Sequence, residues 1–207
     1  MSEFTWPPDP SLFGATGLPE RGEEIPAAVL VAIFLSGEAS EPNLVLTRRR
    51  ADLKRHAGEI SFPGGRRDAE DADLAETALR EAEEEIGLPR SEVRLLGELP
   101  PTSTFATNYV IHPFVGVIPE GRAWRPSARE VDAVLELPLQ AIREGRTRTR
   151  MQRRGISFET DAYVVGDDLI WGATARIVEH LLEQLDSGGQ LAGELAREAG
   201  ARRPTAS

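Results

Sequence analysis

The sequence predicts a domain of the α/β (α+β) class, in which a mixed β-sheet is sandwiched between helices. Three observations lead to this prediction. The chain has 207 residues, which is the size of one domain. Apolar, β-branched segments outnumber segments with helical periodicity. The two kinds of segment also do not alternate strictly along the chain, as they would in a doubly wound parallel sheet.

Strands are predicted where apolar and β-branched residues run together between turn residues. Residues 27–35 and 43–47 form two such runs, separated by Ser36-Gly37-Glu38. A short strand over residues 59–62 stops at Pro63-Gly64-Gly65. Further strands are predicted over residues 93–99, 109–118, 131–137 and 157–165. The run 109–118 is almost wholly apolar, which predicts a central position in the sheet.

Helices are predicted from caps and from apolar spacing. The first covers residues 73–86, because Asp73 and Glu76 have capping-box spacing and Gly87 is a stop signal. Residues 174–185 repeat apolar side chains at helical spacing, and residues 191–199 predict a weaker final helix.

These elements predict one central domain with two short extensions. Residues 1–24 are predicted to be an irregular arm, 25–187 the domain, and 188–207 a C-terminal helix and tail. Residues 143–154 contain six arginines and one glutamate, and are predicted to form a loop. That loop is interpreted as a solvated segment, an intersubunit contact, or a clamp or lid for nucleotide phosphates.

Composition excludes several classes of protein. The absence of cysteine excludes disulfides, zinc thiolate sites and a cysteine nucleophile. No apolar run approaches the ~20 residues of a membrane span, and the N-terminus lacks the features of a signal peptide, so we expect a cytoplasmic protein. A formal charge of −10 argues against a nucleic-acid partner. The charge is uneven, however, because residues 68–85 hold nine acids and one arginine, whereas residues 48–67 hold seven basic and two acidic residues.

Candidate chemistry is concentrated in the helix predicted over residues 73–86. Its small and apolar residues form one stripe, and Glu81, Glu84 and Glu85 are predicted to lie together on the opposite side. A solvated acidic face is the simplest interpretation. Gly64 and Gly65, which follow a strand, favour a second interpretation, namely a metal site. Glycine lets the backbone approach other groups closely, and clustered carboxylates beside such a backbone suit a hard divalent cation such as Mg²⁺.

The same helix carries a family resemblance. The segment Arg80-Glu81-Ala82-Glu83-Glu84-Glu85-Ile86-Gly87-Leu88 resembles the core of the Nudix box, Arg-Glu-apolar-x-Glu-Glu-x-Gly-apolar. Upstream and downstream segments, which together span about residues 27–185, are similar to the coenzyme A pyrophosphatase group of Nudix hydrolases. These segments are Leu46-Thr47 with Arg49, then Leu53, His56, Gly58, Glu59 and Phe62-Pro63-Gly64-Gly65, then Pro113-Phe114-Val115-Gly116, Glu130-Val131, Leu137-Pro138-Leu139 and residues 170–176.

The glycine loop before the helix departs from the general box. The box calls for glycine at position 66 and an acid at position 72, whereas this chain has Gly65 and Ala72. The loop is therefore one residue longer, as the coenzyme A group tolerates. Asp71 and Asp73 flank the vacant acidic position, so the resemblance does not say whether a loop acid reaches the metal.

The resemblance implies a Nudix fold and hydrolysis of a pyrophosphate bond with Mg²⁺ or Mn²⁺. It assigns Glu81 and Glu85 as metal ligands and Glu84 as a ligand or an orienter of metal-bound water. It also implies that Arg80 is an ion-pair partner of a box glutamate. Glu130, on a loop, is either a member of a structural ion pair or a candidate general base. Candidate substrate-binding residues are Arg49, Arg55, His56, Gly64 and Gly65, with Arg48 and Arg50 as weaker candidates. Trp171, Tyr109 and Phe114 are expected in the core.

The expected substrate is coenzyme A or an acyl derivative, with 3′,5′-ADP and (acyl-)4′-phosphopantetheine as products. Two alternatives remain open at this point. One is a Nudix hydrolase of ADP-ribose, NADH or another nucleotide. The other is a non-catalytic ligand sensor with the Nudix fold, although a sensor does not need three box glutamates. A homodimer is also compatible with the sequence, whereas membrane and nucleic-acid partners are not expected.

Overall fold

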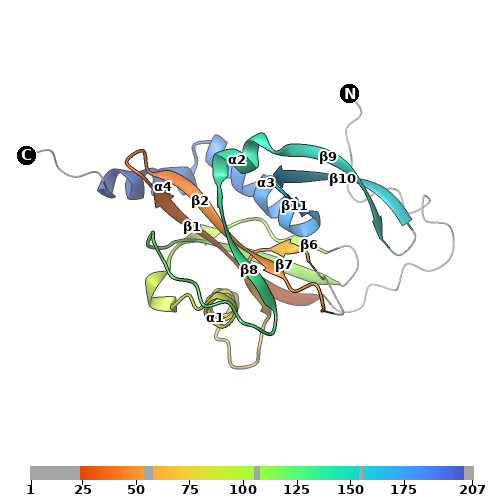
Figure 1. The fold of residues 1–207 in the computed structure, drawn as a ribbon. Coiled ribbons are helices and arrows are strands. Elements are labelled where there is room, and N and C mark those ends of the chain that lie inside the picture. Colours follow the sequence, from red (N-terminus) through yellow and green to blue (C-terminus); the bar gives the residue numbers. More distant parts are fainter. Residues whose placement is uncertain (1–23, 54–57, 105–107, 154–155, 203–207) are drawn as a thin grey trace, which may run out of the picture.

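The computed structural model describes residues 24–53, 58–104, 108–153 and 156–202. They form a large mixed sheet with helices on both faces and a second, smaller sheet (Figure 1). The path through the large sheet is β3-β2-β1-β7-β5, with β4 on β1, β6 on β7 and β8 on β2. Strands β1 and β7 are parallel and the other pairs are antiparallel. The predicted mixed sheet between helices is therefore confirmed.

The elements run in the following order. They are β1 (Ile25–Ser36), β2 (Glu41–Arg49), β3 (Ile60–Ser61), β4 (Gly64–Arg66), α1 (Leu74–Ile86), η2 (Arg90–Glu92), β5 (Arg94–Glu98), β6 (Thr102–Ser103), β7 (Tyr109–Val117), β8 (Val131–Pro138), α2 (Leu139–Glu144), β9 (Arg146–Arg153), β10 (Ile156–Val165), β11 (Asp168–Trp171), α3 (Gly172–Asp186) and α4 (Gln190–Arg202).

Strand β1 is buried on both faces, which explains its continuous apolar sequence. Alternate side chains point to opposite sides of a strand. Leu30 and its alternate neighbours therefore pack beneath α1, whereas Val31 and its neighbours belong to the core on the other face, which includes residues of α2, α3 and α4. Strand β7 lies between β1 and β5, so the predicted central position of residues 109–118 is confirmed.

The ends of α1 follow the predicted capping. The Asp73 side chain accepts a hydrogen bond from the Glu76 backbone N–H, and Gly87 takes the left-handed conformation with φ of 69°. These caps fix where the helix starts and stops, and therefore which side chains it turns toward the sheet.

The predicted loop over residues 143–154 is wrong. Residues of this segment end α2 and form β9, the edge strand of the antiparallel sheet β11-β10-β9. The alternation of Arg and Thr over residues 146–150 has the period of a strand. Across the ladder, Arg150 lies opposite Glu159 and Arg148 opposite Asp161, and opposite charges in such positions stabilise strand pairing. The arginines are thus accommodated in a strand by acids on its neighbour.

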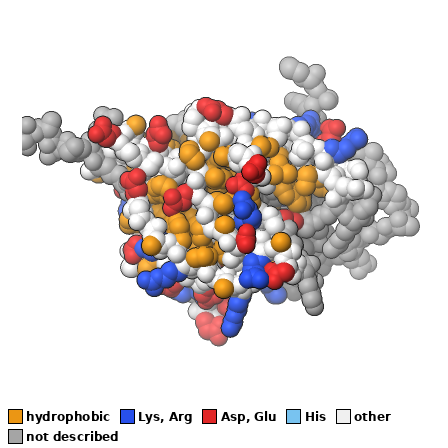
Figure 2. All heavy atoms as spheres, viewed as in Figure 1, with side chains coloured by type: hydrophobic (Ala, Val, Ile, Leu, Met, Phe, Trp, Pro, Cys, Tyr) orange, Lys and Arg blue, Asp and Glu red, His pale blue; other side chains and the backbone are white. Residues whose placement is uncertain are grey.

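On the face of the molecule seen in Figure 2, acidic and basic side chains are interspersed between hydrophobic patches. None of the helices in the described ranges has the length and apolar character that a membrane crossing requires.

Candidate active site

The three box glutamates of α1 lie in three different environments. Glu85 is 6% exposed, whereas the side chains of Glu81 and Glu84 are 17% and 61% exposed. The prediction that all three lie opposite the apolar stripe is therefore wrong for Glu85. Glu85 follows Ala78 by seven residues, about two helical turns, so it borders the stripe and turns toward the sheet.

The two glycines of β4 allow the backbone to approach these carboxylates. A Cβ atom on Gly65 would lie 2.3 Å from Glu81 Oε1, and one on Gly64 would lie 2.3 Å from the Ala28 carbonyl oxygen. The backbone N–H of Gly64 donates a hydrogen bond to Glu85. Any larger residue at position 65 would displace the Glu81 carboxylate, so glycine is required for the close approach of β4 to α1.

Glu85 is a buried acid whose negative charge is poorly compensated. Burial, followed by the charge of Glu81, raises the pKa of Glu85 to about 8. Burial also raises the pKa of Glu81, although Arg80 opposes that shift. Arg49 Nη1 is 3.9 Å from Glu85 Oε1, too far for a hydrogen bond. A cation between these carboxylates would stabilise their ionised forms.

The donor set fits a hard divalent cation. The carboxylates of Glu81 and Glu85 lie near each other beside β4, and Mg²⁺ often takes only one or two protein carboxylates. Among the described residues, no group of three acidic or histidine side chains is already gathered around one point. Glu84 is exposed, whereas Glu81 is held by Arg80 and Glu85 is buried, so Glu81 and Glu85 are the two carboxylates whose positions the fold fixes.

Arg80 holds Glu81 in place and is itself held by Asp71. Its Nη1 donates to Glu81 Oε1 at 3.0 Å, as the predicted ion pair requires. Its Nε and Nη2 donate to the two Asp71 carboxylate oxygens at 2.9 and 3.0 Å. Asp71 is buried and also accepts from the Thr77 hydroxyl. Hydrogen bonding from Arg80 lowers the pKa of Asp71 well below its usual range.

The sequence left the role of the loop acid open, and the structure places the Asp71 carboxylate against the Arg80 guanidinium, where it accepts two hydrogen bonds. Asp71 stands one position before the acid of the general box, and that shift was the signal available in the sequence. Asp73 caps α1 instead.

Asp71→Asn is expected to destabilise the protein by about 3 kcal/mol, because it removes the buried negative charge that accepts hydrogen bonds from Nε and Nη2 of Arg80. It should also lower metal affinity or activity by about 10-fold, since Glu81 loses its orientation. Urea unfolding and a metal titration would measure both effects. The matched control is Asp68→Asn, whose side chain is 63% exposed and 3.8 Å from Arg80; we expect under about 0.5 kcal/mol there. Equal effects of the two changes would contradict this role of Asp71.

The three arginines predicted at and just after the end of β2 point to different places. Arg49 points toward α1, where its Nη2 lies 3.4 Å from Glu130 Oε2 and its buried Nε has no partner among the described residues. Arg48 pairs with Asp168 on the opposite face, and Arg50 binds the exposed Asp52. Of the three, only Arg49 therefore joins the carboxylates. Arg55 and His56 lie outside the described residues.

Glu130 reaches the site because its loop wraps the end of α1. The backbone N–H groups of Arg125 and Ser127 donate to the last carbonyl groups of the helix, those of Ile86 and Glu85. This loop places Glu130 beside Arg49, and its charge contributes to the raised pKa of Glu85.

Two arginines of the segment 143–154 form ion pairs away from the α1 carboxylates. Arg143 binds Asp186 through two hydrogen bonds of 2.8 Å, and Arg146 pairs with Glu179 of α3. These contacts hold the segment against α3, so a phosphate clamp or lid made by these two arginines is not supported.

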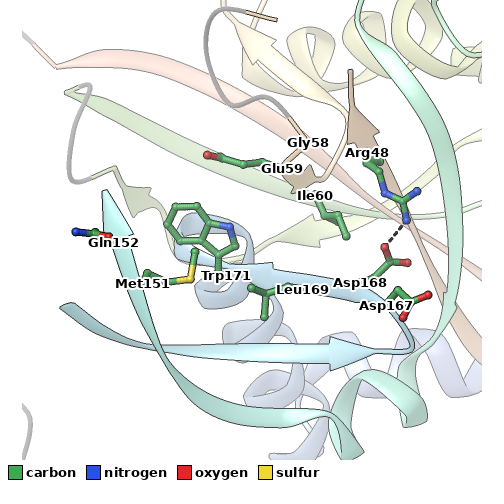
Figure 3. Close-up of a pocket in the computed structure, with 10 residues that line it drawn as sticks. All are labelled: Arg48, Gly58, Glu59, Ile60, Met151, Gln152, Asp167, Asp168, Leu169 and Trp171. Carbon is green, nitrogen blue, oxygen red and sulfur yellow. Dashed lines mark hydrogen bonds and ion pairs between the residues drawn. The ribbon is translucent and has the colours of Figure 1, made fainter. Parts of the chain in front are cut away.

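A cavity of about 690 Å³ opens on the other face of β2 and β3 (Figure 3). Its lining residues come from β2, β3, β9 and β11 and from the segments next to them. They are Arg48, Gly58, Glu59, Ile60, Met151, Gln152, Asp167, Asp168, Leu169 and Trp171. Trp171 was expected in the core, but it is only partly buried and stands on this cavity.

Comparisons with known proteins agree with this architecture. The model of the NUDIX domain family matches residues 24–156. A relative from Salmonella newport, named uncharacterized Nudix hydrolase NudL, is 40% identical over 161 residues, covering 77% of this chain and 82% of the relative. The relative from Salmonella enteritidis PT4 gives the same values.

Solved structures with low sequence identity share the fold. A MutT/nudix family protein from Enterococcus faecalis superposes with a TM-score of 0.55 at 15% identity, covering 85% of this chain and 68% of that one. The NUDIX domain of Shewanella oneidensis NrtR, crystallised with ADP ribose, gives 0.54 at 15% identity, covering 86% and 94%.

Proposed function

The chain belongs to the NUDIX family, and from that premise we propose that it hydrolyses the pyrophosphate bond of coenzyme A or an acyl-coenzyme A. As a Nudix pyrophosphatase it acts on a nucleoside diphosphate derivative. The proposed products are 3′,5′-ADP and (acyl-)4′-phosphopantetheine. The observation that carries the proposal is the buried Glu85 carboxylate, which lies with Glu81 beside the glycines of β4 and faces Arg49.

Glu81 and Glu85 are the proposed protein ligands of Mg²⁺ or Mn²⁺, with Glu84 as a third ligand or as the acceptor that orients a bound water. When bound, a divalent cation neutralises charge on phosphoryl oxygens and lowers the pKa of water. Buried carboxylates with raised pKa values suit this role, because a cation restores the favourable charge balance that burial removes.

The remaining side chains of the site are proposed to orient a carboxylate, bind the pyrophosphate or accept a proton. Arg80 fixes the Glu81 carboxylate through its 3.0 Å hydrogen bond. Arg49 presents guanidinium donors toward the pyrophosphate, and arginine suits phosphate because its planar donors bind two oxygens at once. Glu130 is half exposed next to Arg49 and can accept a proton from the attacking water.

The preference for coenzyme A rests on the segment that precedes the Nudix box. Residues 46–65 resemble the coenzyme A pyrophosphatase group, and this stretch supplies Arg49, Gly64 and Gly65 to the carboxylate site. Arg55 and His56 belong to the same segment and are proposed to bind diphosphate or the 3′-phosphate of the coenzyme.

The substrate is tested by comparing kcat/KM for coenzyme A, octanoyl-coenzyme A, ADP-ribose and NADH with Mg²⁺, and again with EDTA. We expect metal-dependent formation of 3′,5′-ADP, with coenzyme A or its acyl form at least 10-fold better than the other two substrates. Faster turnover of ADP-ribose or NADH would contradict the proposed specificity. Lack of turnover of every substrate with Mg²⁺ or Mn²⁺ would contradict hydrolysis itself and favour a ligand sensor.

A further inference from the structure

The 690 Å³ cavity and the carboxylates lie on opposite faces of the sheet, at the end of β2 that pairs with β3. Arg48 lines the cavity and pairs with Asp168, whereas Arg49 faces Glu85. The backbone of Arg49 pairs with Gly58 and Glu59, which also line the cavity. A ligand that reaches both places would therefore have to extend past this end of β2.

The charge of the cavity does not suit a phosphate group. Among the described residues that line it, three are acids and one is an arginine. That arginine, Arg48, is already paired with Asp168 (Figure 3). Such a lining is less favourable for phosphate than the Arg49 side of the sheet, where the buried Nε of the guanidinium has no partner among the described residues. The α1 side thus combines this guanidinium with carboxylates that are proposed to hold a cation, and a bound cation would neutralise phosphate there.

The floor of the cavity is apolar and belongs to the three-stranded sheet. Met151, Leu169 and Trp171 line it. Their ladder partners on β10 are Phe158, Val164 and Ala162, so those side chains lie on the same face of the sheet. Phe158 and Val164 are 37% and 44% exposed, so the apolar surface continues beyond the cavity. The volume lies within the usual ~300–1,000 Å³ range of small-molecule sites.

The geometry points to an orientation of the substrate: the cavity binds the uncharged, non-nucleotide arm, while the nucleotide and its phosphates stay on the α1 side of β2. This inference rests on the proposed function, because the pantetheine arm of coenzyme A carries amides, a hydroxyl, methyl groups and a thiol but no charge. The indole of Trp171 and the thioether of Met151 offer contact surface for such an arm. The side-chain amide of Gln152 offers hydrogen bonds to its amide groups.

The two product halves separate this orientation from its reverse. In ¹⁵N-labelled protein with Mg²⁺, the indole N–H signal of Trp171, assigned with Trp171→Phe, reports on the cavity. Trp124, whose indole donates to Glu136, serves as an internal reference. Titration with 4′-phosphopantetheine should shift the Trp171 signal, and titration with 3′,5′-ADP should not. A shift with 3′,5′-ADP, or no shift with saturating 4′-phosphopantetheine, would overturn the inference.

A matched pair of variants on β9 checks the assignment. Met151→Glu adds a charge to the floor and should weaken 4′-phosphopantetheine binding at least 5-fold, with the Kd of 3′,5′-ADP within 2-fold of wild type. Thr149→Glu adds the same charge two residues away, outside the residues that line the cavity, and should change neither Kd. Weaker 3′,5′-ADP binding in Met151→Glu would instead place the nucleotide in the cavity. Coenzyme A turnover in the unmodified protein tests the proposed function separately, because the titrations require no catalysis.

Discussion

Glu85→Gln is expected to lower kcat by about 10³-fold, equivalent to about 4 kcal/mol of lost transition-state stabilisation. Glutamine has nearly the same shape but no negative charge, so it removes a proposed metal ligand while filling the same buried space. Steady-state kinetics with coenzyme A at saturating Mg²⁺ would measure the loss. The matched control is Glu83→Gln on the same helix, because Glu83 is half exposed and pairs only with Arg90 among the described residues. Similar activity of the two variants would remove Glu85 from the metal site.

The fold of the Glu85→Gln variant is checked by its pH dependence. The pKa of Glu85, about 8 in the folded protein, is raised above its unfolded value. Without metal, the folded state then binds the extra proton. Its free energy of unfolding should therefore fall as the pH rises from about 5 to 9. Glutamine does not titrate, so the variant should lose this slope and be at least as stable as the wild type at pH 9. A less stable variant would mean that activity was lost through unfolding.

Gly65→Ala is expected to lower kcat by about 100-fold, because the new Cβ atom would lie 2.3 Å from Glu81 Oε1 and push that carboxylate away from its position. The Arg80 hydrogen bond to Glu81 should be lost with it. Kinetics together with a metal titration would show the effect as weaker metal binding and slower turnover.

The control for this change is Gly97→Ala in β5, where no atom lies within 4 Å of the added Cβ. That variant should retain wild-type kinetics. If Gly65→Ala were as active as Gly97→Ala, the close approach of β4 to Glu81 would have no functional importance. Thermal unfolding of both variants separates a local displacement from a general loss of stability.

The sequence predicted those parts of the fold whose signals are local. The caps of α1 depend on Asp73 and Gly87, which act within one turn of the helix, and both are confirmed. Strands β1 and β7 were recognisable because burial on both faces requires a continuous apolar run. The short strands β4 and β6 carry no such run, since they consist of two or three residues whose pairing is set by long strands elsewhere.

Long-range contacts explain what sequence reasoning missed. The arginines over residues 146–150 suggested a loop, because the acids that lie across the ladder are about ten residues away in the chain. The burial of Glu85 depends on how α1 is turned on the sheet, and a helical wheel alone placed it with the exposed glutamates. Asp71 and Arg80 are nine residues apart and meet only when the glycine loop folds back over the helix.

Mn²⁺ binding is the most direct test of the proposed role of the α1 carboxylates. Calorimetric titration of the metal-free protein at pH 7.5 should show saturable binding in the wild type and in Glu83→Gln. Binding should be at least 10-fold weaker in Glu81→Gln and Glu85→Gln. Unchanged affinity in the Glu81 and Glu85 variants would contradict the assignment of these two residues as the metal site.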